Sequence, residues 1–125
     1  MSHNDQGMGT RVLLVDDHAT FRTTARRLLE SEGFEIIGEA EDGQGALEQT
    51  AALSPELVLL DVQLPDLDGF AVAGQLKDRD PPPAVILISS RDGRDFGPLV
   101  RACGARGFVP KADLSGERLR SLLDG

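Results

Sequence analysis

Five short apolar runs recur along the chain, and each is followed by a segment with helical periodicity. The runs start at positions 12, 35, 57, 84 and 107. Most are rich in Val, Ile and Leu without strict alternation, which is typical of strands that are covered on both faces. The spacing accommodates a strand, a helix and two short loops in each repeat. The predicted strands are Val12–Val15, Glu35–Gly38, Leu57–Leu60, Ala84–Ile88 and Gly107–Val109.

The segments between the runs carry one apolar stripe each, as expected of helices packed on a sheet. Phe21, Ala25 and Leu29 recur at four-residue intervals, and Gly33 is well placed to end that helix in a left-handed conformation. Comparable stripes predict four more helices, over Ala46–Leu53, Phe70–Lys77, Phe96–Cys103 and Leu119–Leu123.

Alternating strands and helices predict an α/β fold with a parallel sheet and helices on both faces. Right-handed crossovers leave few topologies, and for five strands the doubly wound order 2-1-3-4-5 is favoured, the flavodoxin-like (βα)5 arrangement. We expect a flexible lead over residues 1–10 and one domain over residues 11–125. In such folds ligands bind beyond the carboxyl ends of the strands, near the switch point between the first and third strands.

Composition narrows the classes of function. The 125 residues suit one domain, and a single cysteine excludes an internal disulfide. The net charge of −8 argues against direct nucleic-acid binding through a broad basic face. The apolar runs are far shorter than the ~20 residues of a membrane-spanning helix, and no secretory signal begins the sequence. We therefore expect a cytoplasmic protein that does not bind membranes.

Polar residues stand at the predicted carboxyl edge of the sheet. Clustered carboxylates repel one another unless a cation joins them, and Mg²⁺ accepts carboxylates while keeping several waters. Three carboxylates, one lysine and Mg²⁺ would sum to −3 + 1 + 2 = 0. The central carboxylate, at the end of the third strand, is then the best-placed nucleophile for a phosphoryl group. The residues at this edge are Asp16, Asp17, Asp61, Ser89, Ser90 and Lys111, and His18 is expected nearby without a ligand role.

Four stretches in order carry a resemblance to a known family. They are Val12-Leu13-Leu14-Val15-Asp16-Asp17, Leu57-Val58-Leu59-Leu60-Asp61 through Pro65 and Asp68-Gly69, Ile86-Leu87-Ile88-Ser89-Ser90, and Gly104-Ala105 through Gly107-Phe108-Val109-Pro110-Lys111. Over residues 11–123 the chain resembles the receiver domain of response regulators in bacterial two-component systems. Lys111-Ala112-Asp113 is most similar to the subgroup fused to LuxR-type DNA-binding domains.

The resemblance implies a role for each matching residue. Asp61 accepts a phosphoryl group from a sensor histidine kinase. Mg²⁺ is bound by Asp61, by Asp17 directly, by the backbone carbonyl of Gln63, and by Asp16 through water. Lys111 pairs with the phosphoryl group or, before modification, with Asp61. Ser89 and Phe108 form the switch, with Phe108 moving inward as Ser89 closes on the phosphoryl group. Gln63 and Arg91 occupy positions that could tune phosphoryl lifetime.

The resemblance implies a signalling switch that catalyses nothing beyond its own phosphorylation and dephosphorylation. A homodimer through the fourth helix, fifth strand and fifth helix is a further expectation. Two other functions stay open, a receiver-like interaction module that is never phosphorylated and a Mg²⁺-dependent phosphohydrolase with an aspartyl-phosphate intermediate. The output is also open between a stand-alone receiver and one part of a transcription regulator.

Overall fold

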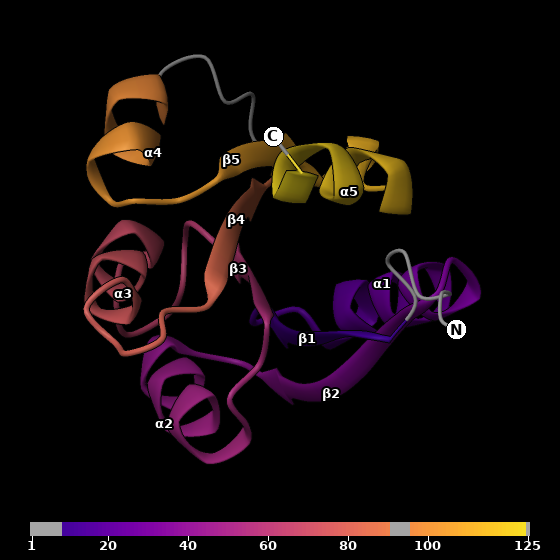
Figure 1. Ribbon diagram of the computed structural model, residues 1–125, viewed down its shortest axis with the longest axis horizontal. Coiled ribbons are helices and arrows are strands. Elements are labelled where there is room, and N and C mark those ends of the chain that lie inside the picture. The colour runs from indigo at the N-terminus through magenta and orange to yellow at the C-terminus, as the bar shows by residue number, and fades with distance from the viewer. Residues whose placement is uncertain (1–8, 91–95, 125) are drawn as a thin grey trace.

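The computed structural model describes residues 9–90 and 96–124, which form a parallel sheet between two layers of helices (Figure 1). The strand order is β2-β1-β3-β4-β5, which confirms the doubly wound topology predicted from the sequence. The strands are β1 (Thr10–Val15), β2 (Phe34–Ala40), β3 (Leu57–Asp61), β4 (Ala84–Ser89) and β5 (Gly107–Pro110). The helices are α1 (Ala19–Ser31), α2 (Gly43–Leu53), α3 (Gly69–Leu76), α4 (Gly97–Ala102) and α5 (Gly116–Asp124).

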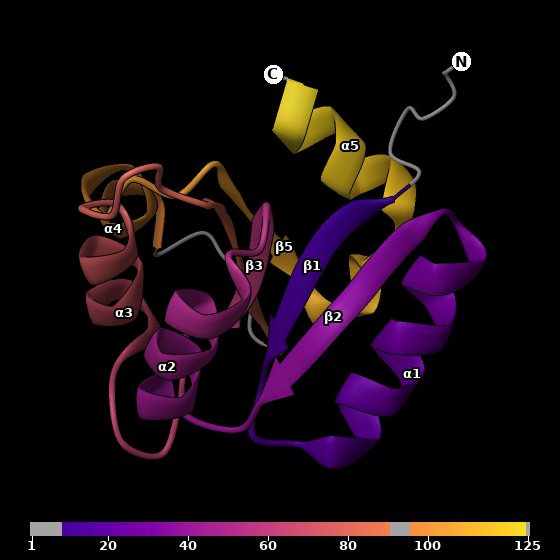
Figure 2. The same ribbon diagram turned by 60° about the horizontal axis from the view of Figure 1, so that its bottom comes forward.

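Alternate residues of the central strands supply two separate cores. Leu13, Val58 and Leu87 face the layer made of α2, α3 and α4, whereas Leu14, Leu59 and Ile86 face α1 and α5. Figure 2 shows α2 and α3 on one side of the strands and α1 on the other. Because both faces of the central strands are covered, these strands need apolar residues at every position, as the sequence pattern indicated.

The second strand is longer than predicted. It runs over seven residues rather than the four of Glu35–Gly38, since Phe34 and Ala40 are also buried in the sheet. Its pairing with β1 shifts register after Ile36, so that Ile37 has no partner and Gly38 pairs with Leu13. A bulge of this kind leaves one residue unpaired and bends the strand. The interrupted apolar pattern of β2 is therefore explained by its bulge and by its position at the edge of the sheet.

Helix boundaries differ from the apolar stripes by up to three residues, as α2 and α4 illustrate. Helix α2 begins at Gly43, three residues before the stripe, because the Asp42 side chain accepts a hydrogen bond from Gly45 N and caps the helix. Helix α4 is shorter than its stripe and spans only Gly97–Ala102. The stripes locate residues that face the core, whereas helix ends are set by capping groups.

No helix within the described ranges is long and apolar enough to cross a membrane.

Candidate functional site

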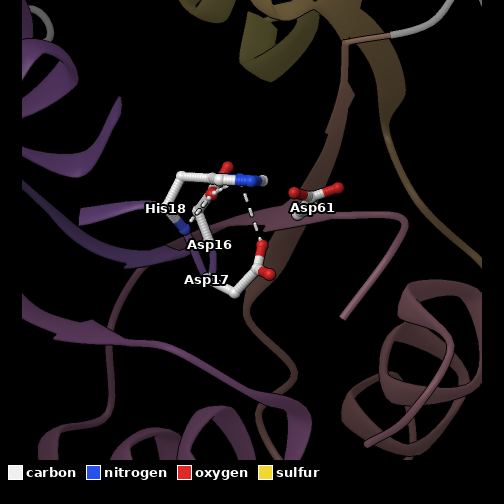
Figure 3. Close-up of side chains that lie close together, drawn as sticks. All are labelled: Asp16, Asp17, His18 and Asp61. Atoms are coloured by element: carbon white, nitrogen blue, oxygen red, sulfur yellow. Dashed lines mark hydrogen bonds and ion pairs between the residues drawn. The ribbon is translucent and has the colours of Figure 1, made fainter. Parts of the chain in front are cut away.

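The carboxyl ends of β1 and β3 bring three aspartates together. Asp16 and Asp17 follow the last residue of β1, and Asp61 is the last residue of the neighbouring strand β3. With His18 they offer four ligand atoms that all lie within 4.8 Å of one another (Figure 3). The predicted topology places these side chains at a common edge, and the structure has them there.

Lys111 reaches this group from the end of β5, an outer strand of the sheet. It begins a short 3-10 turn (Lys111–Asp113) directly after β5. Its Nζ lies 2.5 Å from Asp16 Oδ2 and 3.1 Å from Asp61 Oδ2, so one ammonium bridges two carboxylates. The resemblance implied a pair with Asp61, and the shorter contact is with Asp16. Lys111 Nζ also lies 4.7 Å from the centre of the Phe21 ring, a cation–π contact from the start of α1.

The surroundings raise the pKa of both Asp61 and Lys111. Burial raises the pKa of Asp61 and the nearby Asp16 charge adds to this, while the Gln63 backbone N–H and the Lys111 ammonium act against it. Burial alone would lower the pKa of Lys111, but its contacts with Asp16 and Asp61 outweigh burial and raise it. Lys111 is therefore held in its charged form, whereas burial disfavours the charged form of Asp61.

The three aspartates differ in how firmly they are held. Asp16 is 1% exposed, and its Oδ1 accepts a hydrogen bond of 2.7 Å from His18 N. Asp17 is more open, with 37% of its side chain exposed, and its Oδ1 lies 3.2 Å from His18 Nδ1. Asp61 is buried, and its Oδ1 accepts a hydrogen bond of 2.9 Å from Gln63 N. Asp17 is thus the carboxylate of the three that faces solvent.

This donor set fits a hard divalent cation. Three carboxylates and one ammonium leave a formal charge of −2, which one Mg²⁺ would balance, and carboxylate oxygens are the ligands that Mg²⁺ prefers. The residues that would hold such an ion are Asp16, Asp17 and Asp61, and Gln63 lies two residues beyond Asp61 in the loop after β3. His18 adds an imidazole at the rim, and 69% of its side chain is exposed.

The loop after β3 is fixed against the end of that strand. Gly69 N donates a hydrogen bond of 2.9 Å to Val62 O, and a Cβ built on Gly69 would lie only 2.3 Å from Asp61 O. Only glycine allows this close approach. Asp66, in the same loop, accepts hydrogen bonds from Gly43 N and Gln44 N at the start of α2. The backbone around Asp61 is therefore held from α3, and its loop from α2.

The predicted switch residues lie on β4 and β5. Ser89 ends β4 and is 1% exposed, and it stands one residue beyond Ile88, the register partner of Asp61. Phe108 on β5 is partly buried, with its ring centre 5.5 Å from that of Phe96, which in turn lies 5.6 Å from the Phe70 ring. Phe108 therefore belongs to a row of three aromatic rings that links β5 to α3. Arg91 lies outside the described residues.

Arg22 contacts the site although the sequence analysis did not include it. Its guanidinium donates hydrogen bonds to the backbone carbonyl of Asp16 and, at 2.9 Å, to Oε1 of Glu39. The available signal was its position near the start of the first predicted helix, five residues after Asp17. That spacing shows that Arg22 can lie near the pair, but it does not show that the side chain turns back toward it.

Comparison with known proteins agrees with this geometry. A family model described as the response regulator receiver domain matches residues 12–124. The chain is 35% identical over 127 aligned residues to the transcriptional regulatory protein PdtaR of Mycobacterium tuberculosis, covering 94% of this chain and 62% of PdtaR. It spans about half or less of other curated relatives that it matches.

Solved structures show the same likeness. The signal receiver domain of NarL from Mycobacterium tuberculosis is 36% identical, with a TM-score of 0.82 and coverage of 94% of this chain and 95% of that one. A LuxR-family two-component response regulator from Aurantimonas has the same TM-score of 0.82 at 26% identity, covering 93% of this chain and 83% of that one. This second neighbour agrees with the LuxR-type resemblance of the sequence around Lys111.

Proposed function

Because the chain belongs to the response regulator receiver domain family, we propose that it is a phospho-acceptor switch that receives its phosphoryl group on Asp61 from a sensor histidine kinase. The observation that carries this proposal is that Asp61 lies beside the acidic pair at the end of β1 and 3.1 Å from the Lys111 ammonium. A carboxylate in such a position has a charged partner ready for an incoming phosphoryl group.

The proposed transfer makes one bond and breaks one. A carboxylate oxygen of Asp61 bonds to phosphorus as the bond between phosphorus and the imidazole nitrogen of the kinase histidine breaks. The electron pair of that bond leaves with the imidazole. Mg²⁺ held by Asp17, Asp61, the Gln63 carbonyl and, through water, Asp16 would supply charge neutralisation on the phosphoryl oxygens. Lys111 then exchanges its contact with Asp61 for a phosphoryl oxygen.

Modification changes the balance of charge at the site and so changes the shape around it. The phosphoryl group carries about −1.5 to −2 of charge and three acceptor oxygens, while the Asp61 carboxylate gives up its own negative charge when its oxygen bonds to phosphorus. We propose that Ser89 closes on one of these oxygens and that Phe108 moves inward, which alters the surface of α4, β5 and α5. Phe108 cannot move without repacking Phe96, since the two rings are in contact. Gln63 and Arg91 are proposed to set how long the phosphoryl group lasts.

Two partners are proposed for this chain. A sensor histidine kinase is the phosphoryl donor, and a second copy of this chain is the proposed partner at α4, β5 and α5. We expect the −8 chain itself to make no direct contact with nucleic acid. Since relatives such as PdtaR are named as transcriptional regulators and extend beyond the matched region, control of transcription is the proposed output of the whole protein.

Acetyl phosphate with Mg²⁺, followed by intact-mass measurement, tests the central step. We expect the wild-type chain to gain one phosphoryl group in the presence of Mg²⁺ and to lose that gain in Asp61→Asn. Size-exclusion chromatography with beryllofluoride then tests dimerisation. An unchanged mass in the wild-type chain would refute the phospho-acceptor proposal and favour a receiver-like interaction module. Sustained release of phosphate from small phosphate esters would favour a phosphohydrolase.

A further inference from the structure

Arg22 joins the metal pocket to the second strand of the sheet. Its Nε–H donates a hydrogen bond of 2.9 Å to Glu39 Oε1 near the end of β2, and its Nη1–H donates to the backbone carbonyl of Asp16. The side chain is only 16% exposed. The guanidinium is thus packed against the peptide that links Asp16 to Asp17.

The orientation of that peptide decides where Asp17 points. Within residues 9–90 and 96–124, the polar contact of the Asp17 carboxylate is with His18 Nδ1, and the His18 side chain is itself 69% exposed. The Asp16 carboxylate, by contrast, is buried and held by Lys111 and by His18 N. These contacts fix the Asp16 carboxylate, whereas the direction of the Asp17 carboxylate depends on the backbone from which it projects.

We propose that Arg22 is a positioning residue of the metal pocket. By holding the Asp16 carbonyl, it fixes the backbone that aims the Asp17 carboxylate at bound Mg²⁺. Glu39 keeps the guanidinium in place and balances its charge, so that Arg22 orients the pocket without neutralising Asp17. The inference rests on the proposed function for the identity of the ion, and it concerns how this chain orders its exposed ligand.

Arg26 provides a matched control. It lies one turn further along α1 and donates a hydrogen bond of 2.8 Å to the other oxygen of Glu39. Its remaining hydrogen bonds go to Glu30 and to the Ile36 carbonyl, away from the acidic pair. Replacing Arg26 therefore removes an ion pair with the same carboxylate while leaving the Asp16 carbonyl bound.

The experiment compares Arg22→Met, Arg22→Lys and Arg26→Met with the wild-type chain. Isothermal titration with Mg²⁺ gives the affinity of each protein, and acetyl phosphate labelling at graded Mg²⁺ concentrations gives the half-saturating concentration and the limiting rate. Loss of a group that orients a metal ligand costs about 10–100-fold in metal affinity. We expect Arg22→Met to bind Mg²⁺ about tenfold more weakly and to label at the wild-type rate once Mg²⁺ is saturating. Arg26→Met should match the wild type, and Arg22→Lys, which keeps one donor, should lie between them.

Two results would overturn the inference. One is equal Mg²⁺ affinity in Arg22→Met and Arg26→Met, and the other is a labelling rate in Arg22→Met that stays low at saturating Mg²⁺. If Arg22→Met does not fold, Arg22→Lys against Arg26→Met gives the same comparison. Failure of the proposed function shows itself separately, because the wild-type chain would then take up no phosphoryl group, while the titrations would still compare the pockets.

Discussion

Replacing Gly69 with alanine tests whether the start of α3 fixes the end of β3, which carries the proposed phosphoacceptor Asp61. The added Cβ would lie 2.3 Å from Asp61 O and 2.7 Å from Val62 Cα. Real Cβ contacts are essentially never closer than 3.0 Å, so the two backbones must separate by at least 3.0 − 2.3 = 0.7 Å. Both obstacles are backbone atoms and cannot rotate away, which makes the strain unavoidable.

The cost follows from overpacking. Inserting a methyl group into a packed region costs about 1–3 kcal/mol, and the helix gains about 0.5–1 kcal/mol from replacing glycine. We expect a net loss of roughly 1–2 kcal/mol, which lowers the unfolding temperature by about 4–8 °C in a domain of this size. A shift approaching 1 Å in Asp61 also disturbs the reacting geometry, so labelling by acetyl phosphate should slow on the order of tenfold or more.

Gly74→Ala is the control in the same helix. A Cβ built there has nothing within 4 Å, so alanine should raise stability by about 0.4–1 kcal/mol. Thermal unfolding followed by circular dichroism suits this chain, since it has no Trp and no Tyr to report by fluorescence. If Gly69→Ala unfolds at the same temperature as Gly74→Ala and labels as fast, the contact between α3 and Asp61 does not constrain the site, and the reasoning is refuted.

Three further predictions follow from the shifted pKa values of Asp61 and Glu39. Because burial raises the pKa of Asp61, the neutral Asp61→Asn should unfold at a higher temperature than wild type in metal-free neutral buffer, and a lower temperature would contradict this. Because the pKa of Asp61 is raised above its ordinary value of 3.8, protons compete with Mg²⁺ for this carboxylate at pH values above 3.8. Calorimetry should therefore show the Mg²⁺ affinity falling as the pH drops toward the raised pKa. An affinity that stays constant down to pH 3.8 would argue against this. The pKa of Glu39 is lowered, since hydrogen bonds from Arg26 and Arg22 outweigh the opposite effect of burial. The stability advantage of wild type over Glu39→Gln should therefore be complete above pH 4.5 and vanish as the pH falls through the lowered pKa, which urea unfolding at two pH values can check.

Strand order and the edge that carries the site could be predicted because both follow from pattern. Buried strands at regular spacing determine the topology, and the topology brings Asp61 beside the end of β1. The extent of β2 could not be predicted, because polar Glu35 and small Gly38 interrupt its apolar pattern. The bulge in this strand arises from its pairing with β1, which the sequence alone does not reveal. The start of α2 was missed because a capping aspartate, rather than an apolar residue, defines it.

Contacts within the site depend on side-chain geometry, which the spacing of residues in the sequence does not reveal. Lys111, the first residue of the 3-10 turn after β5, comes closer to Asp16 than to Asp61 by 3.1 − 2.5 = 0.6 Å. Arg22 was missed because an arginine early in an amphipathic helix normally points to solvent. It turns inward here because Glu39 on the neighbouring strand pairs with it and the Asp16 carbonyl lies within reach.

The two outer strands of the sheet limit how this molecule can assemble. Exposed strand edges invite pairing with other chains, and proteins discourage this with charges, bulges, proline and short length. Strand β2 carries an exposed Glu35 and a bulge at Ile37, and β5 has four residues and ends in Pro110. Neither edge is a good template for another strand, so continuous sheets between copies are disfavoured. The change that we propose for the helical surfaces would therefore carry little risk of strand-mediated aggregation.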